Sequence, residues 1–362
     1  MFYYFLFPLK DIWFGFNIFR YITFRASMAA VTSFVLCVVF GPMIIRVLRK
    51  LDIGQYVRKK HVSALSDFHD AKEGTPTMGG MLIIASLLIS SLLWCRLDND
   101  YVILVLGGMV WMGFIGFIDD YLKLKNQSAK GLRVITKLLG QVVLALIVGG
   151  VVLHSKAIGT DLYIPFIKNA VSSLGIFYIL FILLVIVGAS NAVNLTDGLD
   201  GLAIGCMLFV SFTYAVMAYV TGNSVLSGYL NIFYLPGSGE LTCFCAAMIG
   251  AGLGFLWFNS HPAEVFMGDT GSLALGGSIA IVSVLLKKEV LLLIAGGVFV
   301  MESVSVILQV LFFKTKGKRL FRMSPIHHHF QLKGWSESKI TVRFWIISAI
   351  LAMLSMAALK VR

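Results

Sequence analysis

Two adjacent carboxylates, Asp119 and Asp120, close a long apolar run in the motif Phe117-Ile118-Asp119-Asp120. Neighbouring residues on a helix point about 100° apart, so one carboxylate can face a metal ion while the other orients a neighbouring group. Acidic residues at a helix C-terminus oppose the helix macrodipole, so a structural purpose is hard to find. We therefore predict that the pair carries chemistry; two acids without a role at a membrane boundary are the alternative.

A third carboxylate, Asp269, lies in the turn Met267-Gly268-Asp269-Thr270-Gly271, directly before another apolar run. The N-terminus of a helix attracts anions, and a carboxylate beside it could hold a cation that bridges to phosphate. Magnesium in proteins is bound through one or two carboxylates together with substrate phosphates. The turn therefore indicates a cation site; a simple helix cap is the alternative.

One glycine-containing turn, residues 194–201 (NLTDGLDG), gathers Asn194, Asp197 and Asp200 between two apolar runs. Its side-chain oxygens suit a hard cation or the hydroxyls of a ribose. It lacks the alternating acids and the final Glu of a calcium loop. A helix-capping turn without further function is the alternative.

Basic and hydroxyl groups complete the set. Three consecutive histidines, residues 327–329, lie in a loop with Lys316 and Arg322. Consecutive histidines seldom converge on one metal, so contacts to phosphate or sugar are the better prediction, with a solvated loop as the alternative. Lys72 precedes the segment 74–80 (GTPTMGG), whose hydroxyls and N–H groups lie near a helix start; a proline-capped span beginning explains most of that segment.

The elements that position these groups are membrane spans. Hydrophobic residues make up 58% of the 362 residues and the mean hydropathy is +0.89, which rules out an ordinary soluble fold and a disordered chain. Continuous runs such as 176–187 argue against an outer-membrane barrel. A span needs about 20 apolar residues, so we predict one all-α polytopic membrane domain. Its ten spans lie near residues 25–46, 77–95, 101–118, 134–153, 171–190, 201–220, 241–258, 272–286, 289–313 and 340–359.

The charged residues predict how the spans are oriented. Five loops that would share one membrane face hold 19 of the 30 Lys and Arg, which places that face in the cytoplasm and both termini outside. The same loops hold 11 of the 18 carboxylates. One face thus collects bases and acids, as a site for a phosphorylated substrate and a metal requires; no nucleic acid is needed to explain the net charge of +12. These loops are roughly 46–76, 119–137, 191–200, 259–271 and 314–339.

Two further features describe the periphery and the thiols. Residues 1–24 hold eleven aromatics, which suit a bilayer interface, so we expect a short periplasmic interfacial helix before a catalytic domain at 25–362. The five cysteines have no zinc-site spacing and are expected to be buried free thiols. They are Cys37, Cys95, Cys206, Cys243 and Cys245.

Taken together, the motifs around Asp119, Asp197 and Asp269 resemble the polyprenyl-phosphate N-acetylhexosamine-1-phosphate transferases. The segments 74–80 and 325–330 (PIHHHF) resemble one branch, the phospho-N-acetylmuramoyl-pentapeptide transferases. The resemblance runs from about residue 25 to the C-terminus. It implies an inner-membrane enzyme that moves phospho-MurNAc-pentapeptide from UDP to undecaprenyl phosphate, releases UMP, requires Mg²⁺ and forms a homodimer. The sequence adds only a weak packing signal for a dimer, Gly250-x-x-x-Gly254.

The resemblance also assigns roles to matching residues. Asp269 would be the principal Mg²⁺ ligand, with Asp119 and Asp120 lining the catalytic centre, one of them as base or nucleophile. Other groups would bind substrate: Asn194, Asp197 and Asp200 the uridine and diphosphate, Lys72, Lys123 and Lys137 the phosphates, and Asn259 and Phe266 the nucleotide. Thr77, at the beginning of the second span, would also bind substrate. His327, His328 and His329 would lie beside the diphosphate-sugar, His327 and His328 as members of the catalytic set.

Two other functions compete with this one. The first is a sister transferase that uses UDP-N-acetylglucosamine. The triple histidine together with the Gly-Thr-Pro-Thr segment favours the pentapeptide branch over it. A transporter would place ionisable groups near the bilayer midplane, whereas the acids here cluster at span ends. Glu302, inside the ninth span, fits a transporter better; a buried carboxyl there must be neutral or paired, and we expect it to stabilise a kink or line a lipid groove.

Overall fold

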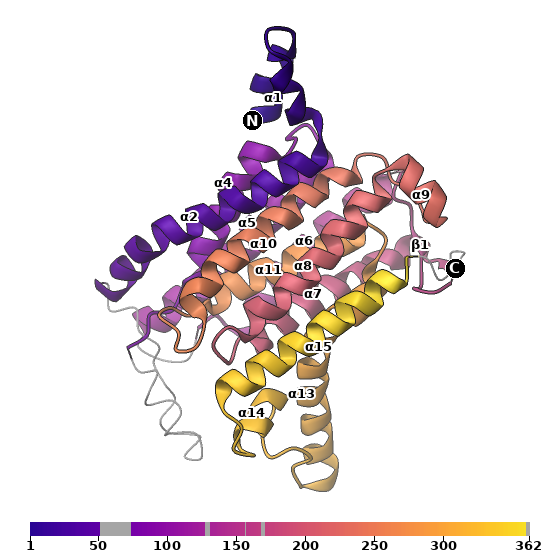
Figure 1. The fold of residues 1–362 in the computed structure, drawn as a ribbon. Coiled ribbons are helices and arrows are strands. Elements are labelled where there is room, and N and C mark those ends of the chain that lie inside the picture. The colour runs from indigo at the N-terminus through magenta and orange to yellow at the C-terminus, as the bar shows by residue number, and fades with distance from the viewer. Residues whose placement is uncertain (51–73, 127–130, 156, 168–170, 360–362) are drawn as a thin grey trace.

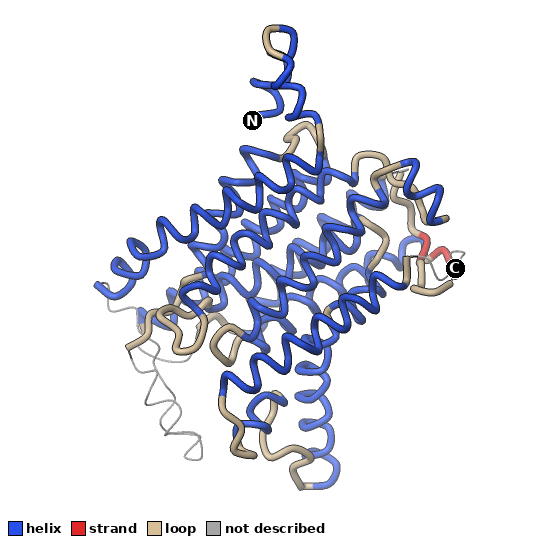
Figure 2. The backbone as a smooth tube through the Cα atoms, viewed as in Figure 1, coloured by secondary structure: helices blue, strands red, loops and turns tan. Residues whose placement is uncertain are grey.

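The computed structural model describes residues 1–362 except 51–73, 127–130, 156, 168–170 and 360–362. The described chain is helical almost throughout, and its only strands are two residues long (Figure 2). The helices and strands are α1 Phe2–Leu6, η1 Phe7–Asp11, η2 Phe14–Arg20, α2 Ile22–Lys50, α4 Gly80–Trp94, α5 Asp100–Lys125, α6 Val134–His154, β1 Asp161–Leu162, β2 Ser172–Ser173, η4 Gly175–Phe177, α7 Tyr178–Thr196, α8 Leu202–Thr221, α9 Ser224–Leu230, η5 Ser238–Glu240, α10 Leu241–Asn259, α11 Gly268–Leu285, α12 Glu289–Ala295, α13 Gly297–Lys316, α14 Ile326–Gln331 and α15 Glu337–Ala357.

Nine of the described helical segments are long and apolar enough to cross a membrane, and α4 is a shorter apolar helix of 15 residues. These ten segments correspond to the ten predicted spans, so the prediction of an all-α polytopic membrane protein is confirmed. Figure 1 shows most of them side by side and inclined in the same sense, whereas α13 runs at a different angle, and the short antiparallel pair β1–β2 lies at one end.

The centre of the bundle is α11, in which every residue from Thr270 to Leu285 is buried. Its neighbours are α5, α7 and α4. Glycine, alanine and serine recur along α11, so surrounding helices approach it closely. Added to Gly116 of α5, a Cβ atom would lie 2.2 Å from the backbone oxygen of Asp269. The two carboxylate-bearing helices therefore touch backbone to backbone at the level of the predicted site.

The Gly250–Gly254 pair packs α10 against α2 within one chain. A Cβ atom at Gly250 would lie 2.0 Å from the Ala30 carbonyl oxygen, and one at Gly254 would lie 2.4 Å from Cys37 Cβ. The interpretation of this motif as a dimer contact is therefore wrong, because an intramolecular helix pair already fills it. The five cysteines are free and buried, as predicted.

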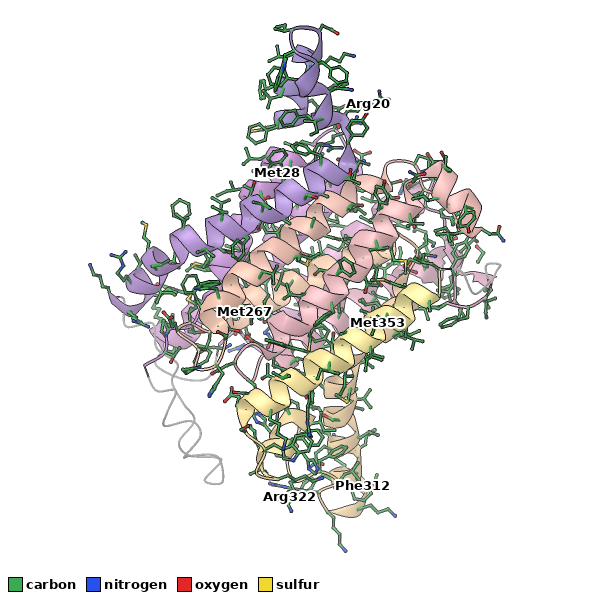
Figure 3. All side chains as sticks on the ribbon, viewed as in Figure 1. Arg20, Met28, Met267, Phe312, Arg322 and Met353 are labelled. Carbon is green, nitrogen blue, oxygen red and sulfur yellow. The ribbon has the colours of Figure 1, made fainter. Side chains whose placement is uncertain are left out.

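The predicted ninth span is two helices, since α12 ends at Ala295 and α13 begins at Gly297. The break falls at the glycine pair, one and a half turns before Glu302, so Glu302 does not lie at the kink. Beyond the break, α13 leaves the bundle and pairs with α14, and Phe312 and Arg322 mark this projecting hairpin in Figure 3.

The aromatic N-terminus is three short helical pieces rather than one interfacial helix. The pieces α1, η1 and η2 project beyond the bundle (Figure 1). Phe2 packs on Trp94 with ring centroids 4.8 Å apart, and the Tyr4 hydroxyl donates to Asp98 at 2.6 Å. Proline and glycine at positions 8 and 15 interrupt a continuous helix.

Candidate active site

Asp119, Asp120 and Asp269 meet at one end of the bundle, which we call the carboxylate end. One oxygen from each lies within 4.8 Å of the others, which makes the three a group able to hold a metal ion. Asp119 and Asp120 are each 3% exposed. Met267, labelled in Figure 3, lies at the same end. The sequence motifs, separated by about 150 positions, thus converge because α5 ends where α11 begins.

Asp120 caps the N-terminus of α11. Its Oδ1 accepts the N–H of Asp269 at 3.2 Å, and its Oδ2 accepts the N–H and hydroxyl of Thr270 at 2.9 and 2.7 Å. The first N–H groups of a helix lack partners within the helix, and a carboxylate there is also favoured by the macrodipole. Asp120 therefore orients the neighbouring helix, which is one of the two roles that the pair's geometry predicts.

Asp119 faces a different set of groups. Its Oδ1 accepts the N–H of Leu132 at 2.9 Å, and its Oδ2 lies 2.5 Å from Lys123 Nζ. Lys123 also lies 3.1 Å from Asp269 Oδ2 and 3.6 Å from Asp120 Oδ1. One ammonium group from the next turn of α5 is thus shared by all three carboxylates.

Asp269 is not a helix cap. The N-cap position of α11 is Met267 and has no side-chain cap hydrogen bond. The Asp269 carboxylate instead lies 2.5 Å from Lys137 Nζ, contributed by the first turn of α6. Three carboxylates against two lysines leave one net negative charge in a largely buried cluster. Hard oxygen ligands with residual negative charge fit a divalent cation such as Mg²⁺.

The segment 74–80 forms the wall beside α11. The Gly79 and Gly80 N–H groups donate to the carbonyls of Phe266 and Met267 at 2.8 and 2.9 Å. Gly268 has φ +72°, and a Cβ there would lie 2.7 Å from Asp120 Oδ2 and 3.0 Å from Thr77 Oγ1. Thr77 is therefore placed beside the carboxylates. Lys72 lies outside the described residues.

The turn 194–201 joins α7 to α8 at the carboxylate end. Asn194 lies in the last turn of α7. Its buried Nδ2 has no hydrogen-bond partner among the described residues, so it is available to a ligand. Asp197 follows as the C-cap residue of α7. Asp200 is buried, and its Oδ2 accepts from His261 Nδ1 at 2.9 Å and from the Ala263 N–H at 3.2 Å.

Asn259 holds two loops together. Its Oδ1 accepts the Gly201 N–H at 3.0 Å and its Nδ2 donates to the Val265 carbonyl at 2.8 Å. Phe266 is half-buried, and its N–H donates to Pro76 at 2.8 Å. The described contacts of Asn259 therefore position the loop that presents Phe266.

Two of the three histidines lie together: the ring centroids of His327 and His328 are 4.2 Å apart. His327 is fully buried, with Nδ1 3.2 Å from Glu302 Oε2, and a Cβ on Gly198 would lie 2.4 Å from its Nε2. His328 Nδ1 lies 2.7 Å from Gln331 Oε1. His329 Nδ1 accepts the Arg322 N–H at 3.1 Å, and burial, aided by nearby Lys333 and Arg322, lowers the pKa of His329. Only His327 reaches the 194–201 turn by these contacts.

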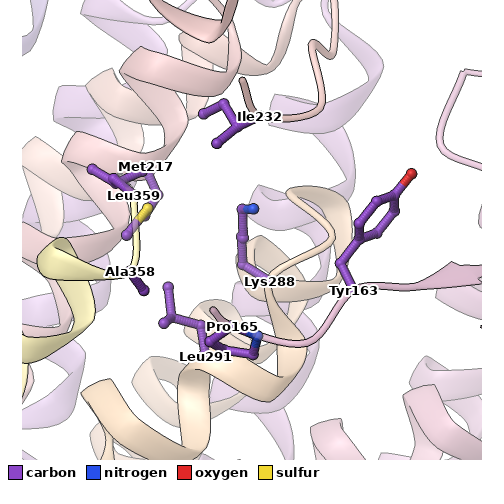
Figure 4. A pocket seen from close by; sticks show the side chains of 8 residues that line it. All are labelled: Tyr163, Pro165, Met217, Ile232, Lys288, Leu291, Ala358 and Leu359. Atoms are coloured by element: carbon purple, nitrogen blue, oxygen red, sulfur yellow. The ribbon is translucent and has the colours of Figure 1, made fainter. Parts of the chain in front are cut away.

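Two cavities lie away from the carboxylates. One, of about 290 Å³, is an apolar groove between α7, α12 and α13, lined among others by Phe181, Val300 and Glu289. The other lies around Lys288 (Figure 4), which shares it with Tyr163 and apolar side chains. Neither cavity contains the three carboxylates.

Comparisons with known proteins agree with this geometry. A model of glycosyl transferase family 4 matches residues 102–287, and a phospho-N-acetylmuramoyl-pentapeptide-transferase signature matches residues 72–84. Proteins named phospho-N-acetylmuramoyl-pentapeptide-transferase are 53% identical in Desulfotalea psychrophila and 51% identical in Citrifermentans bemidjiense, each over 100% of both chains. The chain belongs to the phospho-N-acetylmuramoyl-pentapeptide-transferase family. The resemblance predicted from the motifs is thus confirmed, and the protein is a transferase with a multi-pass membrane fold.

The phospho-N-acetylmuramoyl-pentapeptide-transferase signature, residues 72–84, includes the segment 74–80 that packs beside α11. Three residues that contact Asp200 were not predicted from the sequence: Glu337, Thr341 and His261. Glu337 and Thr341 are four residues apart and lie on one helix face, which is the local signal that could have found them.

Proposed function

We propose that the protein transfers phospho-MurNAc-pentapeptide from UDP-MurNAc-pentapeptide to undecaprenyl phosphate, giving lipid I and UMP. The observation that carries the proposal is the cluster of Asp119, Asp120 and Asp269 with Lys123 and Lys137, buried at one end of a bundle of apolar helices. Phosphoryl transfer depends on positioning and on electrostatic stabilisation around the phosphates. A bundle without a separate soluble domain suits a membrane-bound acceptor.

Asp269 and Asp119 would hold Mg²⁺ in this proposal. Their side chains keep oxygens directed to the lysines, whereas both oxygens of Asp120 accept hydrogen bonds from the start of α11. When bound, the cation would neutralise charge on the diphosphate of the nucleotide. Asp120 would keep α11, and with it Asp269, at the correct distance from α5.

The remaining side chains would bind the nucleotide sugar. Lys123 and Lys137 would exchange carboxylate contacts for substrate phosphates, and Lys72 would join them. Asn194 has an unpartnered Nδ2 for a polar ligand group, and Asp197 and Asp200 would face the uridine side. Asn259 and Phe266 would lie beside the nucleotide, and Thr77 beside the carboxylates. His327, His328 and His329 would lie beside the diphosphate-sugar.

The acceptor would attack directly. A phosphate monoester has a second pKa near 6, so the lipid phosphate is largely dianionic at pH 7 and needs little help from a base. The groove between α7, α12 and α13 is apolar and would accommodate the polyprenyl chain. Its helix α13 also carries Glu302, whose carboxylate contacts His327.

We propose that the transferase lies in the bacterial inner membrane with the carboxylate end in the cytoplasm and both termini outside, because 19 of the 30 basic residues belong to the five sequence segments predicted for that face. A homodimer remains part of the proposal through family membership alone, because the glycine motif of α10 packs against α2 of the same chain.

Turnover tests the proposal directly. Membranes that contain the protein are supplied with UDP-MurNAc-pentapeptide, undecaprenyl phosphate and Mg²⁺, and release of UMP is measured. We expect UMP only when all three are present. Replacement of the nucleotide by UDP-N-acetylglucosamine should abolish release; release from that nucleotide alone would assign the sister reaction instead.

A further inference from the structure

Side chains from other parts of the chain contact the backbone of Asp200 and Gly201. The Asp200 N–H donates to Glu337 Oε1 at 2.7 Å, and its carbonyl accepts from the Thr341 hydroxyl at 3.2 Å. The Gly201 N–H donates to Asn259 at 3.0 Å, and its carbonyl accepts from Trp345 Nε1 at 3.1 Å. The Gly201 carbonyl also accepts the Gly205 N–H at 3.0 Å, and each of these four backbone groups has a tertiary contact.

Three of these four contacts come from one face of α15. Glu337, Thr341 and Trp345 are spaced by four residues, so they stack along the helix. Trp345 packs so closely that a Cβ on Gly205 would lie 2.0 Å from its Nε1. The C-terminal helix is thus fitted to the turn and to the beginning of α8.

Glu337 occupies the critical end of this face. Its side chain is 9% exposed, and its second oxygen lies 4.0 Å from His261 Nδ1, which in turn contacts the Asp200 carboxylate. Gly201 has φ +70°, which glycine adopts about as readily as a negative φ, so the conformation of the turn depends on its contacts. Loss of the acceptor would leave the Asp200 N–H without its partner in a largely dry site.

We propose that Glu337 is a positioning residue of the transferase. By accepting the Asp200 N–H it holds the 194–201 turn in its nucleotide-binding conformation, and it would act on the nucleotide through this turn. The inference rests on the proposed function, in which Asn194 and Asp197 of this turn bind the nucleotide. It predicts selective loss of nucleotide affinity when the acceptor oxygen is removed.

Glu337→Ala and Glu337→Gln test the proposal, with Ser338→Ala as the matched control on the same turn, where Ser338 is exposed. The KM values for UDP-MurNAc-pentapeptide and undecaprenyl phosphate, kcat, and the rise in melting temperature caused by UMP are measured for each. In Glu337→Ala we expect the nucleotide KM to rise about tenfold, the loss of one hydrogen bond to a charged group. The lipid KM should stay unchanged and the shift caused by UMP should shrink.

Glu337→Gln keeps an acceptor oxygen at the same place, so its nucleotide KM should stay within about threefold of wild type. Thr341→Val, which removes the hydroxyl that donates to the Asp200 carbonyl, should change the nucleotide KM in the same direction as Glu337→Ala. A Glu337→Ala protein with an unchanged nucleotide KM, or one whose two KM values rise together, would overturn the inference. If the wild type itself shows neither turnover nor a UMP-dependent shift, the proposed function fails instead.

Discussion

Lys137 Nζ lies 2.5 Å from Asp269 Oδ2, although 132 residues separate the two in sequence. Lys137 comes from the first turn of α6 and Asp269 from the first turn of α11, so this one contact joins the two helices at the carboxylate end. Lys123 completes the arrangement from α5, 3.1 Å from the same oxygen. Two cations therefore converge on the carboxylate that we assign to Mg²⁺, and they are the groups a substrate phosphate would meet.

Asp269→Asn should abolish turnover while sparing the fold. The Asp269 side chain does not cap α11, so loss of its charge should shift the melting temperature by no more than a few degrees. UMP release should fall by orders of magnitude, because a divalent cation would lose its principal carboxylate. Turnover and melting are measured on one detergent preparation across a magnesium titration. Near-normal turnover at ordinary magnesium would contradict the assignment and favour Asp119.

Lys123→Met should impair turnover far more than Lys125→Met. Lys123 contacts all three carboxylates, whereas Lys125, two residues later on α5, is exposed. Without Lys123 the carboxylates repel one another, and the substrate phosphates lose one cation. We expect a drop in kcat/KM of about a hundredfold, the effect of losing a charge-stabilising group, and little change in Lys125→Met. Equal effects of the two substitutions would show that Lys123 acts only through the net charge of the loop.

The core of this site could be predicted from sequence, because acids at the ends of apolar runs are rare and their positions at one membrane face follow from the spans. The separate roles of Asp119 and Asp120 could not be predicted. Whether Asp119 or Asp120 caps α11 depends on how α5 is rotated, and rotation is decided by packing at glycines such as Gly116. The contact from Glu337 to Asp200 joins residues 137 apart, and no local pattern predicts which turn a helix face will meet.

Glu302 shows the same limit from the other direction. The sequence indicated that a carboxyl inside a span must be neutral or paired, and His327 Nδ1 lies 3.2 Å from Glu302 Oε2 without a hydrogen bond between them. Glu302 was expected to stabilise a kink or to line a lipid groove. The break in the ninth span occurs instead at Gly296 and Gly297, where the backbone is least constrained, and the side chains that line the apolar groove do not include Glu302.

Glu302→Ala should destabilise the protein more than Glu302→Gln. Both Glu302 and His327 are fully buried, and their nearest polar atoms lie 3.2 Å apart without forming a hydrogen bond. Alanine would remove the polar group beside the buried imidazole, at a cost of roughly 1–3 kcal/mol. Glutamine keeps a hydrogen-bonding group beside His327 and should recover much of that loss. Thermal unfolding and turnover of both variants are compared. Identical melting temperatures for the two would mean that the contact with His327 contributes nothing to stability.

Orientation in the membrane can be tested with a reporter that gives signal only in the cytoplasm. A fusion after Lys316 should be active and a fusion after Arg362 should be silent, since 19 of the 30 basic residues belong to sequence segments predicted to lie on the side of Lys316. The reverse pattern would place the carboxylates away from the compartment of the nucleotide, and the proposed function would fall with it.

Lys287 should make stability depend on pH. It lies between α11 and α12, fully buried, with Nζ 3.2 Å from the Gly159 carbonyl and 3.8 Å from the centroid of the Tyr178 ring. Burial lowers the pKa of Lys287 to about 7, whereas an unfolded lysine has a pKa near 10.4. Between these values the unfolded chain binds more protons, so the free energy of unfolding contributed by Lys287 rises with pH. Below about pH 7 both states are charged and the full cost of the buried charge is present. The melting temperature of Lys287→Met minus that of wild type should therefore decrease from about pH 6 to about pH 9.

Lys318→Met, at an exposed position, controls for the loss of one positive charge. A difference between Lys287→Met and wild type that does not change with pH would show that Lys287 holds the same charge in both states throughout this range.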